Sequence, residues 1–238
     1  MKPNCFPIED LYIIIAAAGS SQRYRRGDKL MEMLDGIPLF LHSIRAFLPL
    51  ADPSRIVVAV ASGRLEDFRR RAAEYLPPTA RLRWIAGGAT RSETVRRALA
   101  ELPGDKGFVA IHDAARPLAD ADLLLRVLAA ARECGGALPG RRVTDSIKIV
   151  DEHGMIVEAV DRSLLWRAET PQIFDLEKLR RAYLRPGEAT DDAEIMRRSG
   201  WKVKMVEAAA PNPKLTTPEE LEEIRLLLHQ RRRSAAEN

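Results

Sequence analysis

The sequence predicts an α/β protein with a Rossmann-like, mostly parallel sheet flanked by helices. Hydrophobic runs and amphipathic stretches alternate through the first half of the chain. Continuous apolar runs such as Ile56–Val60 are typical of a strand in a sheet buried on both faces. Strand–helix alternation favours parallel pairing through crossover helices. A length of 238 residues, 46% of them hydrophobic, suits a single domain with an apolar core.

Each element of the first half follows from this alternation. We expect strands at four short apolar runs, Leu11–Ala17, Arg55–Ala61, Arg81–Ala86 and Gly107–His112. We expect helices at four amphipathic stretches, Pro38–Pro49, Arg64–Leu76, Thr90–Leu102 and Asp120–Cys134. Ligands of such sheets bind beyond the carboxyl ends of the strands, so we expect the chemistry in the loops that follow strands.

The alternation breaks after Pro139. Residues 143–160 carry short β-type runs on either side of Asp151-Glu152-His153-Gly154, whose glycine suits a tight hairpin turn. Such a hairpin has no obvious face of its own to bury, and we expect it to project as an arm, at about residues 141–162, that pairs with another subunit. The αβ pattern then resumes at Asp175–Tyr183, Asp191–Ser199 and Trp201–Val206, and a final helix opens at Thr217-Pro218-Glu219-Glu220.

Composition narrows the class of partner. Lys and Arg outnumber Asp and Glu by 38 to 34, which suits an anionic small molecule, a nucleic acid or an acidic membrane surface. Aromatic residues are only 5% and no nucleic-acid-binding motif occurs, so we expect no nucleic acid. The apolar run Leu11–Ala18 is too short to span a bilayer, and we expect no membrane partner. Cys5 and Cys134 have neither disulfide nor zinc spacing, which indicates a cytoplasmic protein. Basic runs at Arg69–Arg71 and Arg231–Arg233 are typical of solvated helix faces and tails.

The loop after the first strand is the first candidate site. It runs Ala16-Ala17-Ala18-Gly19-Ser20-Ser21-Gln22-Arg23 and is followed by Lys29. In such a small-residue turn the backbone N–H groups can approach phosphates closely, and the arginine and lysine neutralise them. No Gly-Lys-Ser/Thr follows at Walker A spacing, and Ser21 and Arg23 stand where the dinucleotide pattern has its later glycines. The segment predicts either a nucleotide site or an ordinary strand–helix turn.

This loop resembles that of the nucleotidyltransferases that activate sugars and alditols. Five further segments recur in the same order in 2-C-methyl-D-erythritol 4-phosphate cytidylyltransferases: His112–Pro117, Asp161–Trp166, Thr170–Gln172, Thr190–Ala193 and Lys214–Glu219. The resemblance runs from about Tyr12 to Leu228. Ribitol 5-phosphate cytidylyltransferases share the loop, the His-Asp segment and Thr-Pro-Gln, but usually lack the Asp-Arg-Ser-Leu-Leu-Trp stretch. Molybdenum-cofactor nucleotidyltransferases share only the loop.

The resemblance implies a single nucleotidyltransferase domain over residues 1–238. It implies transfer of CMP from CTP to 2-C-methyl-D-erythritol 4-phosphate with Mg²⁺ or another divalent cation, giving 4-diphosphocytidyl-2-C-methyl-D-erythritol and pyrophosphate in non-mevalonate isoprenoid biosynthesis. It also implies a homodimer joined through the arm. The alternatives are a ribitol 5-phosphate cytidylyltransferase and a non-catalytic nucleotide-binding regulator on the same scaffold. The regulator would be expected to lose Lys29, Asp113 or Lys214, and all three are present.

The residues that the resemblance assigns to the nucleotide are Ala17, Ala18, Gly19, Ser20, Gly87, Gly88, Thr94 and Asp113. Gly87, Gly88 and Thr94 resemble a cytosine pocket, whose backbone carbonyls and hydroxyl would reject uracil. Thr94 could equally be an ordinary helix residue, because Thr90 with Glu93 already forms a capping box. Asp113 ends a buried strand, and its carboxylate is either the Mg²⁺ ligand or a cap of the next helix.

Lys29, Lys214 and Arg23 are the expected catalytic residues. In-line attack on the α-phosphorus spreads negative charge over its equatorial oxygens, where the two ammonium groups would stabilise it, while Arg23 would hold the polyphosphate. A solvated lysine is the ordinary alternative for either lysine. No general base is expected, because the attacking phosphate monoester has a second pKa near ~6 and is already ionised at neutral pH. The four histidines are therefore expected to be structural.

The remaining assignments concern the acceptor. Arg162, Thr170, Thr190 and the arm residue Ser146 resemble the family's contacts to the acceptor phosphate. In the family the arm reaches across a dimer, which implies that Arg162 and Ser146 serve the partner's site. Asp191 and Asp192 are expected to cap the helix that they begin. Arg116 is expected to brace its loop, and Gly140-Arg141-Arg142 resembles a small insertion before the arm.

Overall fold

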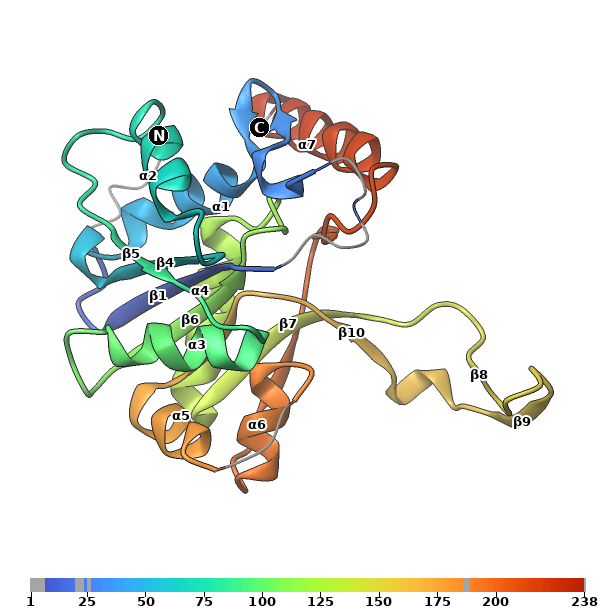
Figure 1. Ribbon diagram of the computed structural model, residues 1–238. Helices are drawn as coiled ribbons and strands as arrows, with labels where there is room; N and C mark the ends of the chain where they lie inside the picture. Colours follow the sequence, from blue (N-terminus) through green and yellow to red (C-terminus); the bar gives the residue numbers. More distant parts are fainter. Residues whose placement is uncertain (1–6, 20–23, 25–26, 186–188, 238) are drawn as a thin grey trace.

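The computed structural model describes residues 7–19, 24, 27–185 and 189–237, and its centre is an eight-stranded sheet. The strand order is β10-β7-β11-β6-β1-β4-β5, with β12 paired to β7 off this path (Figure 1). The strands are β1 (Leu11–Ala17), β4 (Ile56–Val60), β5 (Arg83–Ala86), β6 (Phe108–Asp113), β7 (Gly136–Arg142), β10 (Trp166–Ala168), β11 (Gln172–Asp175) and β12 (Lys204–Glu207). Strands β1, β4, β5 and β6 are mutually parallel, which confirms the predicted fold class.

The register of the parallel strands puts their carboxyl ends at one edge. Strand β1 lies between β4 and β6, with Ala17 opposite Val60 and Ala16 opposite Asp113. The side chains of β1 are almost wholly buried because both faces of the sheet are covered. The loops that follow β1, β5 and β6 therefore meet at this edge, where a ligand of such a sheet is expected.

Helices cover the two faces and bury alternate residues of β1. Ile13 and Ile15 pack in one core with α1 (Leu39–Phe47), α2 (Leu65–Ala73), α4 (Ala121–Cys134) and α7 (Glu220–Glu237). Tyr12 and Ile14 pack in the other with α3 (Arg91–Ala100), α5 (Leu176–Tyr183) and α6 (Asp192–Arg198). Figure 1 shows α1, α2 and α7 above the sheet and α3, α5 and α6 below it. Among the described residues no helix is both long and apolar enough to cross a membrane.

The predicted helices of the first half are all present, each slightly shorter than expected. At α3 and α4 the difference at the start arises because the cap residues stay outside the helix in an extended conformation. Thr90 accepts from the N–H of Glu93, and Asp120 accepts from the N–H of Leu123. At α7 the carboxylate of Glu220 accepts from the N–H of Thr217, which is the back-reaching half of the predicted capping box.

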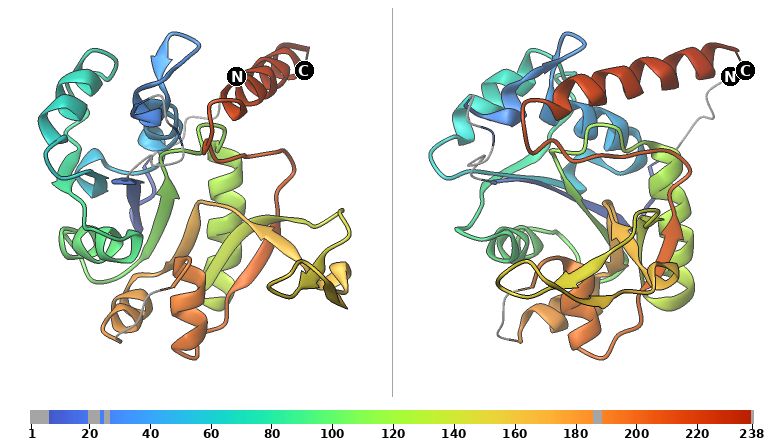
Figure 2. Two further views of the ribbon diagram at one scale, coloured as in Figure 1. Left: turned by 45° about the vertical axis from the view of Figure 1, so that its right-hand side comes forward. Right: turned by 90° about the vertical axis from the view of Figure 1, so that its right-hand side faces the viewer.

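The hairpin arm is present and stands away from the body of the molecule (Figures 1 and 2). It consists of β8 (Lys148–Val150) and β9 (Ile156–Ala159), joined by a turn in which Gly154 has φ 79°. The side chains of Ile156 and Val157 are each 66% exposed. The predicted hairpin is therefore confirmed, and it presents apolar side chains to solvent. A second, much smaller hairpin, β2 (Met33–Leu34) and β3 (Ile37–Pro38), precedes α1.

Three strands around the arm were not predicted. Strands β7, β10 and β11 lack the long apolar runs that marked the others, and they form because they complete the sheet beside β6. Gly140-Arg141-Arg142, which resembles a small insertion before the arm, forms the end of β7 and pairs with β10. A Cβ atom at Gly140 would lie 2.8 Å from the carbonyl oxygen of Arg167, so the strands approach closely there.

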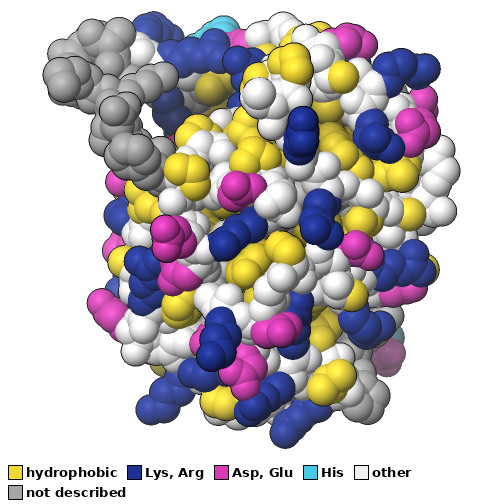
Figure 3. Space-filling model, turned by 90° about the vertical axis from the view of Figure 1, so that its left-hand side faces the viewer, with side chains coloured by type: hydrophobic (Ala, Val, Ile, Leu, Met, Phe, Trp, Pro, Cys, Tyr) yellow, Lys and Arg dark blue, Asp and Glu magenta, His cyan; other side chains and the backbone are white. Residues whose placement is uncertain are grey.

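The two basic runs differ in their surroundings. Arg69–Arg71 lie on the exposed face of α2 and pair with acidic residues of the same region, as expected of a solvated helix face. In contrast, Arg231 donates to the carbonyl oxygens of Leu118 and Pro211, and Arg232 pairs with Asp35. The prediction of a solvated tail is thus wrong for Arg231, whose side chain is only 25% exposed, whereas Arg232 is exposed as expected. Figure 3 shows one face on which basic and acidic side chains are interspersed.

Candidate active site

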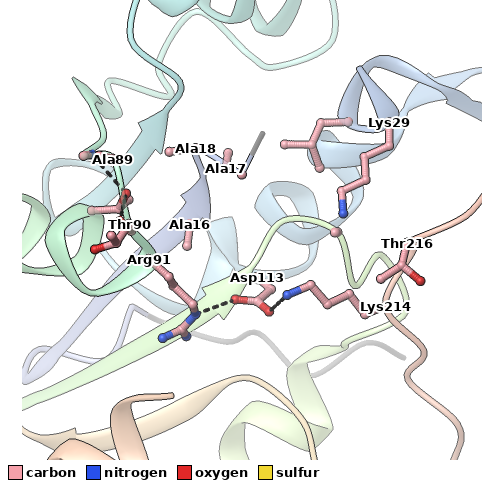
Figure 4. A pocket seen from close by; sticks show the side chains of 15 residues that line it. Ala16, Ala17, Ala18, Lys29, Ala89, Thr90, Arg91, Asp113, Lys214 and Thr216 are labelled. Atoms are coloured by element: carbon pink, nitrogen blue, oxygen red, sulfur yellow. Dashed lines mark hydrogen bonds and ion pairs between the residues drawn. The ribbon is translucent and has the colours of Figure 1, made fainter. Parts of the chain in front are cut away.

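A pocket of about 480 Å³ opens at the carboxyl edge of the parallel strands. It is formed by the loops that follow β1, β5 and β6, by the short 3₁₀ turn Lys29–Met31 and by the segment before α7 (Figure 4). Its lining residues are Ala16, Ala17, Ala18, Gly19, Lys29, Leu30, Gly88, Ala89, Thr90, Arg91, Thr94, Asp113, Ala115, Lys214 and Thr216. The structure thus brings together most of the residues predicted to bind the nucleotide or to catalyse. Ser20 and Arg23 lie outside the described residues.

The loop after β5 is pressed against the loop after β1. The N–H of Gly87 donates to Val60 O at 2.7 Å, and Gly87 O accepts from the Arg97 guanidinium at 2.8 Å. A Cβ atom at Gly87 would lie 2.4 Å from the Cβ of Ala18, so only glycine fits without a shift. Gly87 does not itself line the pocket, but its lack of a side chain allows the two lining loops to approach this closely.

The hydroxyl of Thr94 shapes the same loop. It donates to Thr90 O at 2.9 Å and accepts from the N–H of Gly88 at 3.0 Å. The Glu93 carboxylate accepts from the N–H of Ala89 at 2.7 Å. Because Thr94 already uses its proton within the loop, the structure gives it a scaffolding position. Its predicted contact with the cytosine ring stays a prediction.

Asp113, the last residue of β6, has a cation on each carboxylate oxygen (Figure 4). Its Oδ1 lies 3.2 Å from Arg91 Nε, and its Oδ2 lies 2.7 Å from Lys214 Nζ. Burial by itself raises the pKa of the Asp113 carboxyl, but the charges of Arg91 and Lys214 outweigh burial and hold it below its ordinary value. The carboxylate is therefore ionised at neutral pH. Helix α4 is capped by Asp120, so the alternative that Asp113 caps it is wrong.

The two predicted catalytic lysines come from opposite ends of the sequence. Lys29 lies in a 3₁₀ turn that Asp28 caps by accepting from the N–H of Leu30. Its ammonium group donates to Leu215 O at 2.8 Å, across 186 positions of sequence. Since Leu215 directly follows Lys214, both lysines lie at one wall of the pocket. Two ammonium groups beside a loop of small residues form a site suited to the phosphates of a nucleotide.

Comparisons with known proteins decide the family. The family model described as IspD, 2-C-methyl-D-erythritol 4-phosphate cytidylyltransferase, matches residues 11–230. A protein of that name from Synechococcus sp. (strain CC9902) is 42% identical over 218 residues, covering 89% of this chain and 94% of its own. Another from Bacillus mycoides (strain KBAB4) is 36% identical over 222 residues, covering 91% and 97%. The chain belongs to this family.

Solved structures of the 2-C-methyl-D-erythritol 4-phosphate cytidylyltransferase family have the same fold. The Thermus thermophilus enzyme superimposes with a TM-score of 0.74 at 29% identity, covering 92% of this chain and 98% of its own. A structure titled 4-diphosphocytidyl-2C-methyl-D-erythritol synthase gives a TM-score of 0.76 at 28% identity, covering 93% and 99%. The family predicted from the sequence motifs is therefore confirmed, and with it the enzyme class, nucleotidyltransferase.

The residues predicted to bind the acceptor of this cytidylyltransferase family lie in three different places. Ser146 and Arg162 are exposed on the arm, where Ser146 accepts from Lys148 and Arg162 donates to Thr144 O. Thr190 is exposed just before α6. Thr170 is 4% exposed, and its hydroxyl accepts from the N–H of Asp113 at 3.1 Å. The structure thus places Thr170 as a support of the Asp113 loop, and all four acceptor roles stay predictions.

His112 and Arg116 support this loop, as expected from the sequence. The ring of His112 is buried and hydrogen-bonds Thr170 through Nδ1 and both Ser43 and Arg116 O through Nε2. Burial lowers the pKa of His112 to about 4, so the ring is neutral at neutral pH. The guanidinium of Arg116 donates to Asn212 O at 2.6 Å. Neither residue lines the pocket.

The role of Arg91 was not predicted from the sequence, and the prediction that Asp192 caps α6 is wrong. Asp191 caps α6 by accepting from the N–H of Glu194, as predicted, but Asp192 is fully buried and pairs with Arg91 Nη2 at 2.7 Å. Burial alone lowers the pKa of Arg91, yet the charges of Asp192 and Asp113 raise it above its ordinary value. An arginine directly after a helix-cap threonine does not by itself indicate that it pairs with Asp113 and Asp192, because both partners are distant in sequence.

Proposed function

We propose that this protein transfers CMP from CTP to 2-C-methyl-D-erythritol 4-phosphate and releases pyrophosphate, because its relatives are named 2-C-methyl-D-erythritol 4-phosphate cytidylyltransferase. The observation that carries the proposal is the convergence of Lys29, Asp113 and Lys214 on a pocket beside the small-residue loop after β1. A regulator that only bound nucleotide would have no need for this combination of two ammonium groups and a buried ionised carboxylate. The product would be 4-diphosphocytidyl-2-C-methyl-D-erythritol, an intermediate of non-mevalonate isoprenoid biosynthesis.

The reaction needs charge neutralisation and positioning. An oxygen of the acceptor phosphate forms a bond to the α-phosphorus of CTP, and the bond from that phosphorus to the β-bridging oxygen breaks, so that pyrophosphate leaves with the electron pair. The attacking oxygen is already ionised at neutral pH because the second pKa of a phosphate monoester is about 6. Lys29 and Lys214 would stabilise the negative charge that spreads over the equatorial oxygens. The buried, neutral His112 is not required as a base.

Asp113 is the residue that would hold a divalent cation such as Mg²⁺. Among the described residues no three His, Cys, Asp or Glu side chains form a metal site. A lone ionised carboxylate still fits this ion, since Mg²⁺ is commonly held by one or two carboxylates together with substrate phosphates. Once bound, the ion would neutralise charge on the triphosphate oxygens. Lys214, now paired with Asp113, lies beside the same position.

The arm would complete the site of a second subunit. The exposed apolar side chains of β8 and β9 need a surface to cover them, and a homodimer supplies one. Ser146 and Arg162 lie on the arm and would then contact the acceptor phosphate bound to the partner. Thr190 lies on the body of the molecule and would contact the acceptor phosphate bound to its own subunit. Such a dimer would explain why the arm extends away from the body of its own subunit (Figure 2).

The test is pyrophosphate release with CTP and Mg²⁺, offering 2-C-methyl-D-erythritol 4-phosphate and ribitol 5-phosphate in parallel. We expect release with the erythritol phosphate, reduced by Lys29→Ala about 10²-fold to 10³-fold, as for other groups that stabilise transition-state charge. Lys106→Ala is the control, because Lys106 is an exposed lysine outside the pocket.

The other outcomes each favour a different function. Release with ribitol 5-phosphate alone would overturn the substrate but keep the chemistry. Binding of CTP without release from either acceptor would favour the regulator. Equal activity of Lys29→Ala and Lys106→Ala would remove Lys29 from the catalytic assignment.

A further inference from the structure

Arg91 joins the three segments on which the site depends. It is the first residue of α3, and its guanidinium contacts Asp113 Oδ1 through Nε at 3.2 Å and Asp192 Oδ2 through Nη2 at 2.7 Å. Arg91 therefore links the loop after β5, the end of β6 and the start of α6. Figure 4 shows its side chain approaching Asp113 from the side opposite Lys214.

Asp192 holds the Arg91 guanidinium in place on the side away from Asp113. Its side chain is fully buried, and its other carboxylate oxygen accepts from the hydroxyl of Tyr183 on α5. The start of α6 is held in addition by Gln172 of β11, which donates to Asp191 and accepts from the N–H of Ala193. A buried carboxylate with fixed partners moves little, so the guanidinium that it holds is also fixed.

The position of α6 relates this link to the acceptor. Thr190, a proposed contact of the acceptor phosphate, lies two positions before Asp192 and directly before Asp191, the cap residue of α6. At the other end of the link, Asp113 is the proposed ligand of the cation on CTP. The Arg91 side chain is 25% exposed and borders the pocket between these two places.

We propose that Arg91 is a positioning residue that holds the Asp113 carboxylate and the Thr190–Asp192 segment in a fixed relative position. Binding of the divalent cation at Asp113 is thereby coupled to binding of the acceptor near Thr190. The inference rests on the roles proposed above for Asp113 and Thr190. The fork of the guanidinium is essential, because it contacts two carboxylates in different directions. A lysine at this position would retain the charge but reach only one of them.

The variants Arg91→Lys, Asp192→Asn and their combination test the link. Arg91→Lys should raise the KM for the acceptor and the Mg²⁺ concentration for half-maximal activity by about tenfold or more, as is typical when a residue that orients a metal ligand is changed. Asp192→Asn should raise the acceptor KM although Asp192 is buried away from the acceptor. The double variant should be no worse than the poorer single variant, because both changes break one link.

Arg180 provides a matched control. Its side chain is 27% exposed and also bridges several partners, donating to Leu99 O and Leu102 O and pairing with Asp105. It joins α5 to the end of α3 and does not line the pocket. Arg180→Lys should lower the melting temperature without changing either kinetic constant at a temperature well below melting.

A direct binding measurement separates this inference from the proposed function. Calorimetric titration of CTP into Arg91→Lys at several Mg²⁺ concentrations should show a weaker dependence of affinity on Mg²⁺ than the unaltered protein, whether or not turnover occurs. If the unaltered protein releases no pyrophosphate but this difference is present, the proposed function fails and the link stands. If Arg91→Lys changes only the melting temperature, as Arg180→Lys does, the link is overturned.

Discussion

At the scale of single residues, the site consists of side chains whose partners come from distant segments. Lys29 reaches the carbonyl oxygen of Leu215, and Lys214 reaches the carboxylate of Asp113. Motifs assign the residue types, because phosphate chemistry requires cations and a hard oxygen ligand. Motifs do not assign the contacts. Thr170, for example, belongs to a recognisable segment, yet its hydroxyl is used to hold the N–H of Asp113.

Thr94 gives a prediction at this scale. Thr94→Val removes the acceptor for the N–H of Gly88 and the donor to Thr90 O, in a position that is 2% exposed. We expect the free energy of unfolding to fall by about 1–2 kcal/mol, the usual cost of lost buried hydrogen bonds. We also expect the KM for CTP to rise, because the wall of the pocket loosens. Denaturant unfolding and steady-state kinetics measure both.

Thr94→Ser is the control for that prediction. Serine keeps the hydroxyl and should stay close to the unaltered protein in the KM for CTP. Equal KM values for the valine and serine variants would show that the hydroxyl has no part in nucleotide binding.

At the scale of elements, the arm is the part that exposes several large apolar side chains to solvent. A two-stranded hairpin is marginally stable by itself in water, and here its apolar side chains are exposed. Helix α7 is the opposite case, because Arg231 donates to Leu118 O and Pro211 O, and Arg225 and Arg232 contact the β2–β3 hairpin. A basic run in α7 thus has a structural role, although basic runs are usually solvated. The apolar side chains of the arm are exposed, although apolar side chains are usually buried.

The arm gives a prediction about assembly. Ile156→Asp places a charge at a position of β9 that the proposed dimer would bury. Association should weaken by about 2 kcal/mol or more, the cost typical of a central interface residue. Sedimentation velocity over a range of concentrations measures the effect. Leu184→Asp is the control, since Leu184 is 84% exposed on the body of the molecule. A monomeric unaltered protein, or a dimer unaffected by Ile156→Asp, would contradict the prediction.

At the scale of the whole molecule, the sheet brings the site together and sets its dependence on pH. Strand β6 runs through the centre of the sheet and carries the buried His112 next to Asp113. Charging this imidazole inside the core would be costly, because burial disfavours the charged form. The stability of the sheet and the integrity of the Asp113 loop are therefore linked through one side chain.

The pKa of His112 predicts how stability changes with pH. Burial lowers this pKa from 6.5 to about 4, so between these values the unfolded chain binds a proton that the folded chain does not. The free energy of unfolding should therefore decrease as pH falls from 6.5 to 4, by up to roughly 3 kcal/mol from this residue. The lowered pKa of His42 acts in the same direction.

Denaturant titrations across this range, with the His112 ring followed by NMR, check the prediction. His112→Gln should lower stability at pH 7 but show a shallower dependence on pH. A His112 ring that titrates near its ordinary pKa in the folded protein would contradict it.

Much of the fold could be predicted because its signals are local. The strands β1 and β4 are continuous apolar runs, and helices such as α3 and α4 begin at polar caps. Strands β7, β10 and β11 could not be predicted in this way. Gly140 and the arginines of β7 have little intrinsic preference for a strand, and they adopt one because β10 and β12 pair with this end of β7.

By itself the sequence determined the fold class, the family and the residue types of the site, because periodicity, caps and motifs are properties of neighbouring positions. Only the tertiary structure decided that Thr94 and Thr170 use their hydroxyls for support and that Arg231 anchors a helix. It alone showed that Arg91 lies between Asp113 and Asp192. These outcomes depend on which distant groups meet in a buried place, where each charge and each donor must find a partner.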